Sequence, residues 1–125
     1  MHRRRRMHAM NTVMIVEDNM VVATMLDAMV QKLGHTVIGP CVSEEDAFAA
    51  IADQTPSHAV LDINLGGDVT SFAVAEALQE RGVKIAFSSA YSHYVIPENL
   101  ALATFMPKPI NQTSLETFLG RASAP

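Results

Sequence analysis

Short apolar runs alternate along this chain with stretches in which apolar residues recur every three or four positions. Helical spacing is clearest between Val21 and Leu33, and Gly34 ends it. Each apolar run has the length of a buried strand. The pattern predicts five strands, at 12–16, 36–38, 58–63, 83–88 and 104–106.

Capping and turn residues delimit the other segments. Gly39-Pro40 is expected to close the second strand, and Ser43 with Asp46 resembles a capping box. Pro97 interrupts the weakly patterned stretch 91–103, in which only 98–103 predicts a short helix. Three further helices are expected to carry these apolar residues: Ala47, Phe48 and Ile51; Phe72, Val74, Ala75 and Leu78; and, after Asn111 as cap, Leu115, Phe118 and Leu119.

Strands that alternate with helices predict a doubly wound α/β domain. Parallel strands need crossover connections, and right-handed crossovers place helices on both faces of the sheet. In such sheets, ligands bind beyond the carboxyl ends of the strands. The polar residues expected at those ends are Glu17, Asp18, Asp62, Ser89 and Lys108.

Three of these residues are acids and one is a lysine, which predicts a cation site. Like charges about 4 Å apart repel by about 4 kcal/mol at an effective dielectric constant of about 20. Magnesium prefers oxygen ligands and keeps several waters. We expect Asp18 and Asp62 to bind Mg²⁺ directly, Glu17 through water, and Asn64 through its backbone carbonyl.

The same cluster suits phosphoryl transfer. Aspartate is a nucleophile towards phosphoryl groups when nearby positive charge offsets the negative charge on both reactants. Asp62 is therefore the candidate acceptor. Lys108 would neutralise one phosphoryl oxygen, and the Ser89 hydroxyl would donate to another.

These motifs resemble those of the receiver domains of two-component response regulators. The matching pieces are Val16-Glu17-Asp18-Asn19, Asp62-Ile63-Asn64, Ser89-Ala90 and Lys108-Pro109. In addition, Phe87-Ser88-Ser89-Ala90-Tyr91 with Pro107-Lys108-Pro109 resembles the stand-alone FAT GUY group. The resemblance covers roughly residues 12 to 120 and implies a flavodoxin-like sheet in the order 2-1-3-4-5.

The resemblance also implies how the protein works. A histidine kinase or a histidine phosphotransfer protein would phosphorylate Asp62, and Ser89 and Phe105 would then reorient the face formed around the fourth and fifth strands. Asn64 and Tyr91 would tune the lifetime of the phosphoryl group. Ala90 would follow the switch hydroxyl, and the Lys108-Pro109 peptide would be cis.

Some features depart from the family pattern, and simpler interpretations remain open. Serine replaces the commoner threonine at 89, Gly66-Gly67 replaces a proline-containing loop, and 91–97 matches poorly. Taken singly, the acids suit solvated strand ends or turns, and Lys108 suits a surface turn. Two other functions compete: a small Mg²⁺-dependent phosphohydrolase, and an adaptor with the receiver fold that acts without phosphorylation.

Composition narrows the class of protein. The 125 residues suit one domain, expected over 11–122, after a disordered basic tail at 1–10. The net charge of −4 becomes −8 without the four arginines at 3–6, which argues against a nucleic-acid groove. No apolar run is long enough for a membrane helix. The single cysteine, Cys41, excludes an internal disulfide, so a cytoplasmic location is expected.

The expected partners are therefore proteins. A kinase or phosphotransfer protein would act on this chain, which would signal in trans to a downstream protein as a monomer or weak dimer. Self-phosphorylation and autodephosphorylation would be its only chemistry, so it is not expected to be an enzyme in the usual sense.

We predict structural roles for the remaining histidine, cysteine and methionine residues. His35, His58 and His93 lack ligand spacing and are interpreted as surface or strand-end histidines. Cys41 is interpreted as an inert small residue. Four methionines near the first strand and helix are interpreted as adaptable core residues: Met14, Met20, Met25 and Met29.

Overall fold

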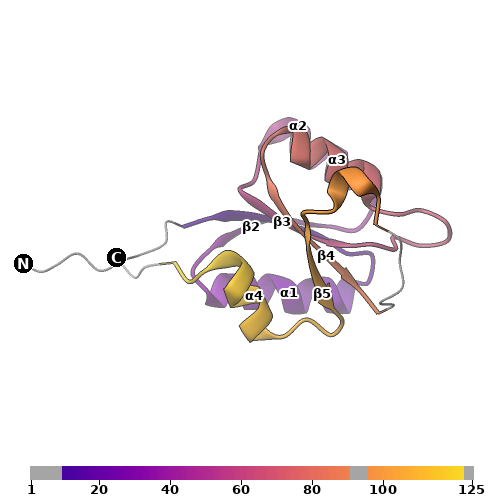
Figure 1. The fold of residues 1–125 in the computed structure, drawn as a ribbon. Helices are drawn as coiled ribbons and strands as arrows, with labels where there is room; N and C mark the ends of the chain where they lie inside the picture. The colour runs from indigo at the N-terminus through magenta and orange to yellow at the C-terminus, as the bar shows by residue number, and fades with distance from the viewer. Residues whose placement is uncertain (1–9, 91–95, 123–125) are drawn as a thin grey trace, which may run out of the picture.

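A computed structural model describes residues 10–90 and 96–122, and they form one five-stranded parallel sheet. The strand order is β2-β1-β3-β4-β5, so the predicted doubly wound topology is confirmed (Figure 1). The strands are β1 (Thr12–Val16), β2 (Thr36–Cys41), β3 (His58–Asp62), β4 (Lys84–Ser89) and β5 (Thr104–Pro107).

Helices cover both faces of the sheet. Helices α2 and α3 lie on one side and α1 and α4 on the other (Figure 1). The helices are α1 (Met20–Lys32), α2 (Glu44–Asp53), α3 (Phe72–Glu80), α4 (Gln112–Leu119) and the 3-10 helix η1 (Glu98–Leu100). The helix expected over 98–103 is therefore only one turn long. None of the helices in the described ranges has the length and apolar character needed to cross a bilayer.

Side-chain caps explain where three helices begin, and two of them, Ser43 and Asn111, were predicted. The side chain of Asn19 accepts hydrogen bonds from the backbone N–H groups of Val21 and Val22 at the start of α1. Ser43 caps α2 and Asn111 caps α4 in the same way. Each cap satisfies backbone donors that have no partner within the helix.

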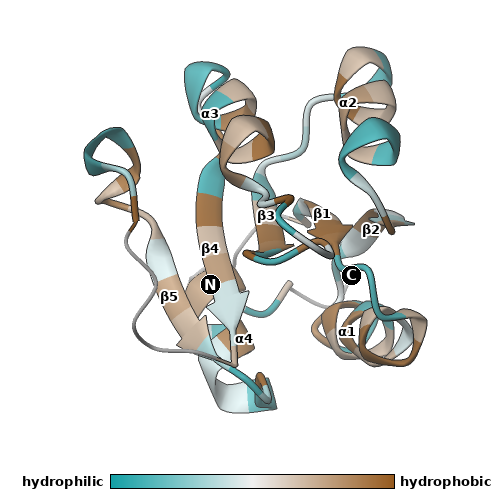
Figure 2. Cartoon of the chain, turned by 90° about the vertical axis from the view of Figure 1, so that its right-hand side faces the viewer, coloured by the Kyte–Doolittle hydropathy of each residue, from teal (hydrophilic) through white to brown (hydrophobic). Residues whose placement is uncertain are grey.

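The core is divided into two apolar layers by the sheet. Along β1, Met14 and Val16 face α2 and α3, whereas Val13 and Ile15 face α1 and α4. Figure 2 shows the sheet between these two helical layers, from β2 at one edge to β5 at the other. Because side chains alternate along a strand, neighbouring residues at a strand end point to different layers. This alternation decides which polar residues share a site.

The expected end of the second strand is wrong. β2 continues through Gly39-Pro40 to Cys41, and its pairing with β1 shifts register between Met14 and Val16. Proline lacks a backbone donor, but an edge strand has an unpaired side, and a bulge accommodates the shift. Gly39 has φ +94°, a backbone conformation that favours glycine.

Several residues expected in the core are exposed. Phe48 on α2 is 39% exposed, and on α1 Val21 is 72% and Met25 55% exposed. Met20 is also exposed and Met29 is half-buried, so only Met14 of the four methionines is a fully buried core residue. The apolar face of α1 is wider than the face that the sheet covers.

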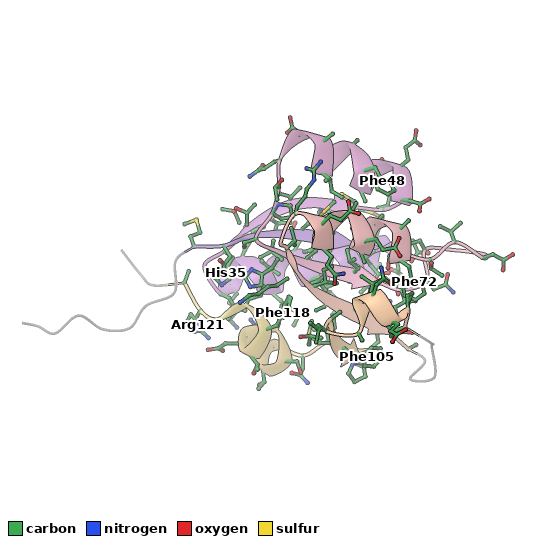
Figure 3. All side chains as sticks on the ribbon, turned by 45° about the horizontal axis from the view of Figure 1, so that its top comes forward. His35, Phe48, Phe72, Phe105, Phe118 and Arg121 are labelled. Atoms are coloured by element: carbon green, nitrogen blue, oxygen red, sulfur yellow. The ribbon has the colours of Figure 1, made fainter. Side chains whose placement is uncertain are left out.

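The two described histidines are buried at strand ends, so of the two interpretations the strand-end one holds for them and the surface one does not. His35 accepts a hydrogen bond from Asn11 N–H at Nδ1 (3.0 Å) and donates from Nε2 to the Gly120 carbonyl (2.6 Å). His58 packs edge-on against Phe118, with ring centroids 5.2 Å apart. Figure 3 labels His35 and Phe118 towards the same end of the molecule. His93 lies outside the described residues.

The buried His58 predicts a loss of stability in acid. Burial, with smaller contributions from Lys84 and His35, lowers the pKa of His58 from 6.5 to about 4. Between these values the unfolded chain binds a proton that the folded chain does not bind, so stability falls as the pH decreases. Denaturant titrations should show His58→Phe gaining about 2 kcal/mol over wild type on going from about pH 7 to about pH 4.

Wild type and variant share every other titrating group, so the difference between them isolates His58. Parallel pH profiles for the two proteins would contradict the prediction.

Candidate functional site

Side chains that lie at or just after the ends of four strands meet at the carboxyl end of the sheet. Glu17 and Asp18 follow β1, Asp62 is the last residue of β3, and Lys108 follows β5. Ser89 is the last residue of β4. Because β1 and β3 are neighbours and β4 lies between β3 and β5, the sheet order brings these distant residues together. A pocket of about 260 Å³ is lined by Asp18, Asp62, Asn64, Ser89 and Lys108, among others.

An ammonium group binds two carboxylates at the base of this site. Lys108 Nζ lies 2.9 Å from Glu17 Oε1 and 3.2 Å from Asp62 Oδ2. Glu17 is only 1% exposed, and its other oxygen accepts a hydrogen bond from Asn19 N–H at 3.1 Å. Both oxygens of the buried glutamate are therefore satisfied, as a buried carboxylate requires.

The surroundings of Asp62 disfavour its ionised form. Its Oδ1 accepts a hydrogen bond from Asn64 N–H at 3.3 Å, and the residue is 7% exposed. Burial, followed by repulsion from Glu17, raises the pKa of Asp62 from 3.8 to about 7, although Lys108 acts in the opposite direction. The carboxylate is thus poised between its charged and neutral forms near neutral pH.

One lysine does not balance three acids. Burial acts to lower the pKa of Lys108, but Glu17 and Asp62 outweigh it and hold that pKa above its usual value. With Lys108 charged, three ionised carboxylates leave the cluster with an excess of negative charge. This excess favours either a proton on Asp62 or a bound cation.

The acidic residues fit a metal ion. Glu17, Asp18 and Asp62 each offer a carboxylate oxygen, and these atoms all lie within 4.8 Å of one another. All three donors are oxygens, which suits a hard cation such as Mg²⁺. Asp18 is exposed, so a cation beside it would keep access to water. The prediction of an acidic cluster able to bind a metal is confirmed; the identity of the ion stays a prediction.

The loop after β3 lines part of the pocket, through Asn64, Gly66 and Gly67. Asn64 Oδ1 accepts a hydrogen bond from Gly66 N–H at 2.8 Å. Gly66 has φ +110°, and a Cβ atom there would lie 3.8 Å from Asp18 Oδ2. The positive φ therefore favours glycine in this turn, whereas a Cβ atom would make only an ordinary contact with the exposed acid.

The other predicted site residues do not all lie in this pocket. Ser89 and Ala90 line the pocket, and the Lys108-Pro109 peptide is cis, as the resemblance implied. Phe105 lies on the edge strand β5 and is 39% exposed (Figure 3). Tyr91 lies outside the described residues. The functional roles assigned to these residues and to the Asn64 carbonyl stay predictions.

Sequence reasoning missed two features of the site. It did not foresee that Lys108 would pair with Glu17 as well as Asp62, or that Asn19 would both cap α1 and bind Glu17. The signal for Asn19 was available, since an asparagine that directly precedes an apolar helical pattern is a typical cap. The pairing of Lys108 depends on residues 91 positions apart in the printed sequence.

Comparisons with known proteins find a sequence relative and several structural neighbours. No family model matches the chain. It is 26% identical over 113 residues to the phyllosphere-induced regulator PhyR of Methylorubrum extorquens, an alignment that covers 88% of this chain and 42% of that protein. The chain thus spans less than half of that relative.

Solved structures show the same fold. The response regulator receiver domain (CheY-like) from Methylobacillus flagellatus is 25% identical, with a TM-score of 0.78, and the match covers 89% of this chain and 97% of that one. The receiver domain of PhyR from Erythrobacter litoralis is 23% identical, with a TM-score of 0.75 and coverages of 94% and 95%. The fold is that of response regulator receiver domains, and these neighbours are signalling domains.

The raised pKa of Asp62 predicts how removing its charge affects stability. Its folded pKa of about 7 lies above 3.8, so the ionised carboxylate destabilises the metal-free protein, and stability falls as the pH rises through 7. In chelator-treated protein, Asp62→Asn should raise the free energy of unfolding by about 1 to 2 kcal/mol at about pH 8 and by less at about pH 5.

Denaturant titrations at the two pH values test this effect. Asp68→Asn, which removes an exposed carboxylate from the loop after β3, is the matched control and should change little at either pH. A destabilised Asp62→Asn variant at about pH 8 would show that Asp62 is held by favourable rather than repulsive charges.

Proposed function

We propose that this chain is a receiver that accepts a phosphoryl group on Asp62 and signals through protein contacts that depend on this modification. The carrying observation is the juxtaposition of Asp62, Lys108 and the acidic pair in one pocket at the carboxyl end of a receiver-type sheet. The similarity to receiver domains and to the regulator PhyR supports it.

The chain's own residues account for the nucleophile. An ionised Asp62 oxygen attacks the phosphorus of the donor, the bond from phosphorus to the donor breaks, and its electron pair leaves with the donor. Asn64 N–H, which donates to Asp62 Oδ1, and Lys108, which binds Oδ2, fix the orientation of the carboxylate. A fixed geometry lowers the entropic cost of attack.

Positive charge and a hydroxyl complete the site. Lys108 exchanges part of its contact with Asp62 for an oxygen of the incoming group, while Glu17 keeps the ammonium in place. Ser89, at the end of β4, donates its hydroxyl to another oxygen. Its movement towards the phosphoryl group, with that of Phe105, carries the signal to the β4-β5 face.

Mg²⁺ is the cation that this donor set favours. Asp18 and Asp62 would hold it directly, with Glu17 acting through water and the Asn64 carbonyl as a neutral ligand. When bound, the ion supplies positive charge that neutralises the phosphoryl oxygens and favours the ionised form of Asp62.

The phosphodonor is a histidine kinase or a histidine phosphotransfer protein, and the output is binding to a downstream protein. A phosphohydrolase would need a further acid to activate water; of the described residues lining the pocket, the acids are Asp18 and Asp62, both assigned to the cation. The adaptor alternative differs in one respect: its partner would bind Asp62→Asn and phosphorylated wild type equally well.

Mass measurement of the intact protein tests the proposal. After incubation with acetyl phosphate and Mg²⁺, wild type should gain about 80 Da, one phosphoryl group, and Asp62→Asn should gain nothing, because it lacks the nucleophile. Asp68→Asn serves as the matched control and should be modified like wild type. An equal adduct on Asp62→Asn would place the modification elsewhere and refute the assignment.

Calorimetric titration with Mg²⁺ tests the cation site separately. Asp18→Asn should weaken binding by at least about tenfold, because it removes a charged ligand from a site with few protein ligands. Asp68→Asn should bind as wild type does. Unchanged affinity in Asp18→Asn would exclude Asp18 as a direct ligand.

A further inference from the structure

A second concavity lies beside the acidic pocket, on the α1 side of the sheet. This α1 groove has a volume of about 420 Å³ and runs between α1 and the segment that follows β5. Its walls are mostly apolar: Val22, Met25, Leu26 and Met29 on α1, and Pro109 and Ile110 opposite. Small-molecule sites typically have such walls and volumes of about 300 to 1,000 Å³.

One buried polar group lines this apolar space. Ser88 is 1% exposed, and within the described ranges its Oγ has no hydrogen-bond partner. Successive residues of β4 point to opposite faces, so Ser89 lines the acidic pocket while Ser88 lines the α1 groove. A buried hydroxyl without a partner is unfavourable and uncommon, and it calls for a group that would pair with it.

The charges around the groove restrict what fits. Among the described lining residues, Lys108 is the charged one, and its ammonium binds Glu17 and Asp62 in the neighbouring site. A charged ligand would therefore lose its hydration without gaining a counterion, which is costly. Neutral ligands meet no such penalty. The flexible side chains of Met25 and Met29 can adapt to the shape of an apolar occupant.

We propose that the α1 groove binds a small neutral ligand that is apolar over most of its surface and carries one oxygen or nitrogen that hydrogen-bonds to the Ser88 hydroxyl. The buried position of Ser88 favours a small molecule that enters the groove over a protein surface laid across it. Because Lys108 and Ala90 line both cavities, an occupant would also touch the lysine that binds Asp62. The inference does not depend on phosphoryl chemistry.

Titrations with p-cresol and toluene, followed by amide NMR, test the proposal. The two probes have similar apolar surfaces, and only p-cresol carries a hydroxyl. Saturable shifts are expected at groove residues such as Val22, Met29 and Ile110 with both probes. Binding of p-cresol should be about fivefold weaker in Ser88→Ala, with toluene unchanged, since the variant removes one hydrogen bond and keeps the space. Ser88→Ala should fold normally, because the deleted hydroxyl has no hydrogen-bond partner in residues 10–90 and 96–122.

Substitutions at two exposed apolar residues, one in the groove wall and one outside it, provide a test variant and its matched control. Met25→Gln removes apolar surface from the groove wall and should weaken both probes, whereas Leu102→Gln, which alters an almost fully exposed side chain outside the groove, should weaken neither.

Three results would overturn the proposal: no shifts at the groove, p-cresol binding that is unchanged in Ser88→Ala, or evidence that a protein covers the groove. A protein that covers the groove would give two results together. Met25→Gln would slow phosphorylation by a phosphodonor protein but not by acetyl phosphate, and p-cresol binding would not depend on Ser88.

Discussion

The contact between Lys108 and two carboxylates organises the functional end of this molecule. Glu17 is fully buried just after strand β1, where an unpaired carboxylate would be strongly destabilising. The lysine that compensates it comes from beyond the edge strand β5, two strands further away than β3. The geometry of the site therefore requires the complete sheet, and a local rearrangement of β5 would be felt at Glu17 and Asp62.

An incomplete charge balance gives the site its chemistry. Lys108 and Asn19 N–H together satisfy both oxygens of Glu17, whereas burial and repulsion from Glu17 raise the pKa of Asp62 to about 7 despite its contact with Lys108. An aspartate whose charge was fully paired with a cation would be a poor nucleophile. An aspartate that faced only the repulsion of neighbouring carboxylates would stay protonated. The exposed Asp18 adds negative charge at the solvent side, so a divalent cation is the natural complement of the pocket.

Strand alternation allows one strand end to serve two cavities. Ser88 and Ser89 are chemically identical neighbours, yet Ser88 lines an apolar groove and has no hydrogen-bond partner among the described residues, whereas Ser89 lines a pocket of charges. The exposed apolar side chains of α1 beside the groove, such as Val21 and Met25, extend beyond what the core needs. This face of the molecule thus combines exposed apolar side chains with a buried hydroxyl that has no partner among the described residues, directly beside Lys108.

The sequence alone determined the order and type of most elements, because apolar periodicity and caps such as Asn19, Ser43 and Asn111 are local signals. It also determined that Glu17, Asp18, Asp62 and Lys108 would converge, since parallel strands present their carboxyl ends at one edge. Local patterns could not reveal the bulge that lets β2 pass Gly39-Pro40, or the exposure of Phe48 and Met25. Those outcomes, like the burial of His35 and His58 and the pairing of Lys108 with Glu17, were decided by the tertiary structure, because they depend on which surfaces distant segments cover and which charges they bring into contact.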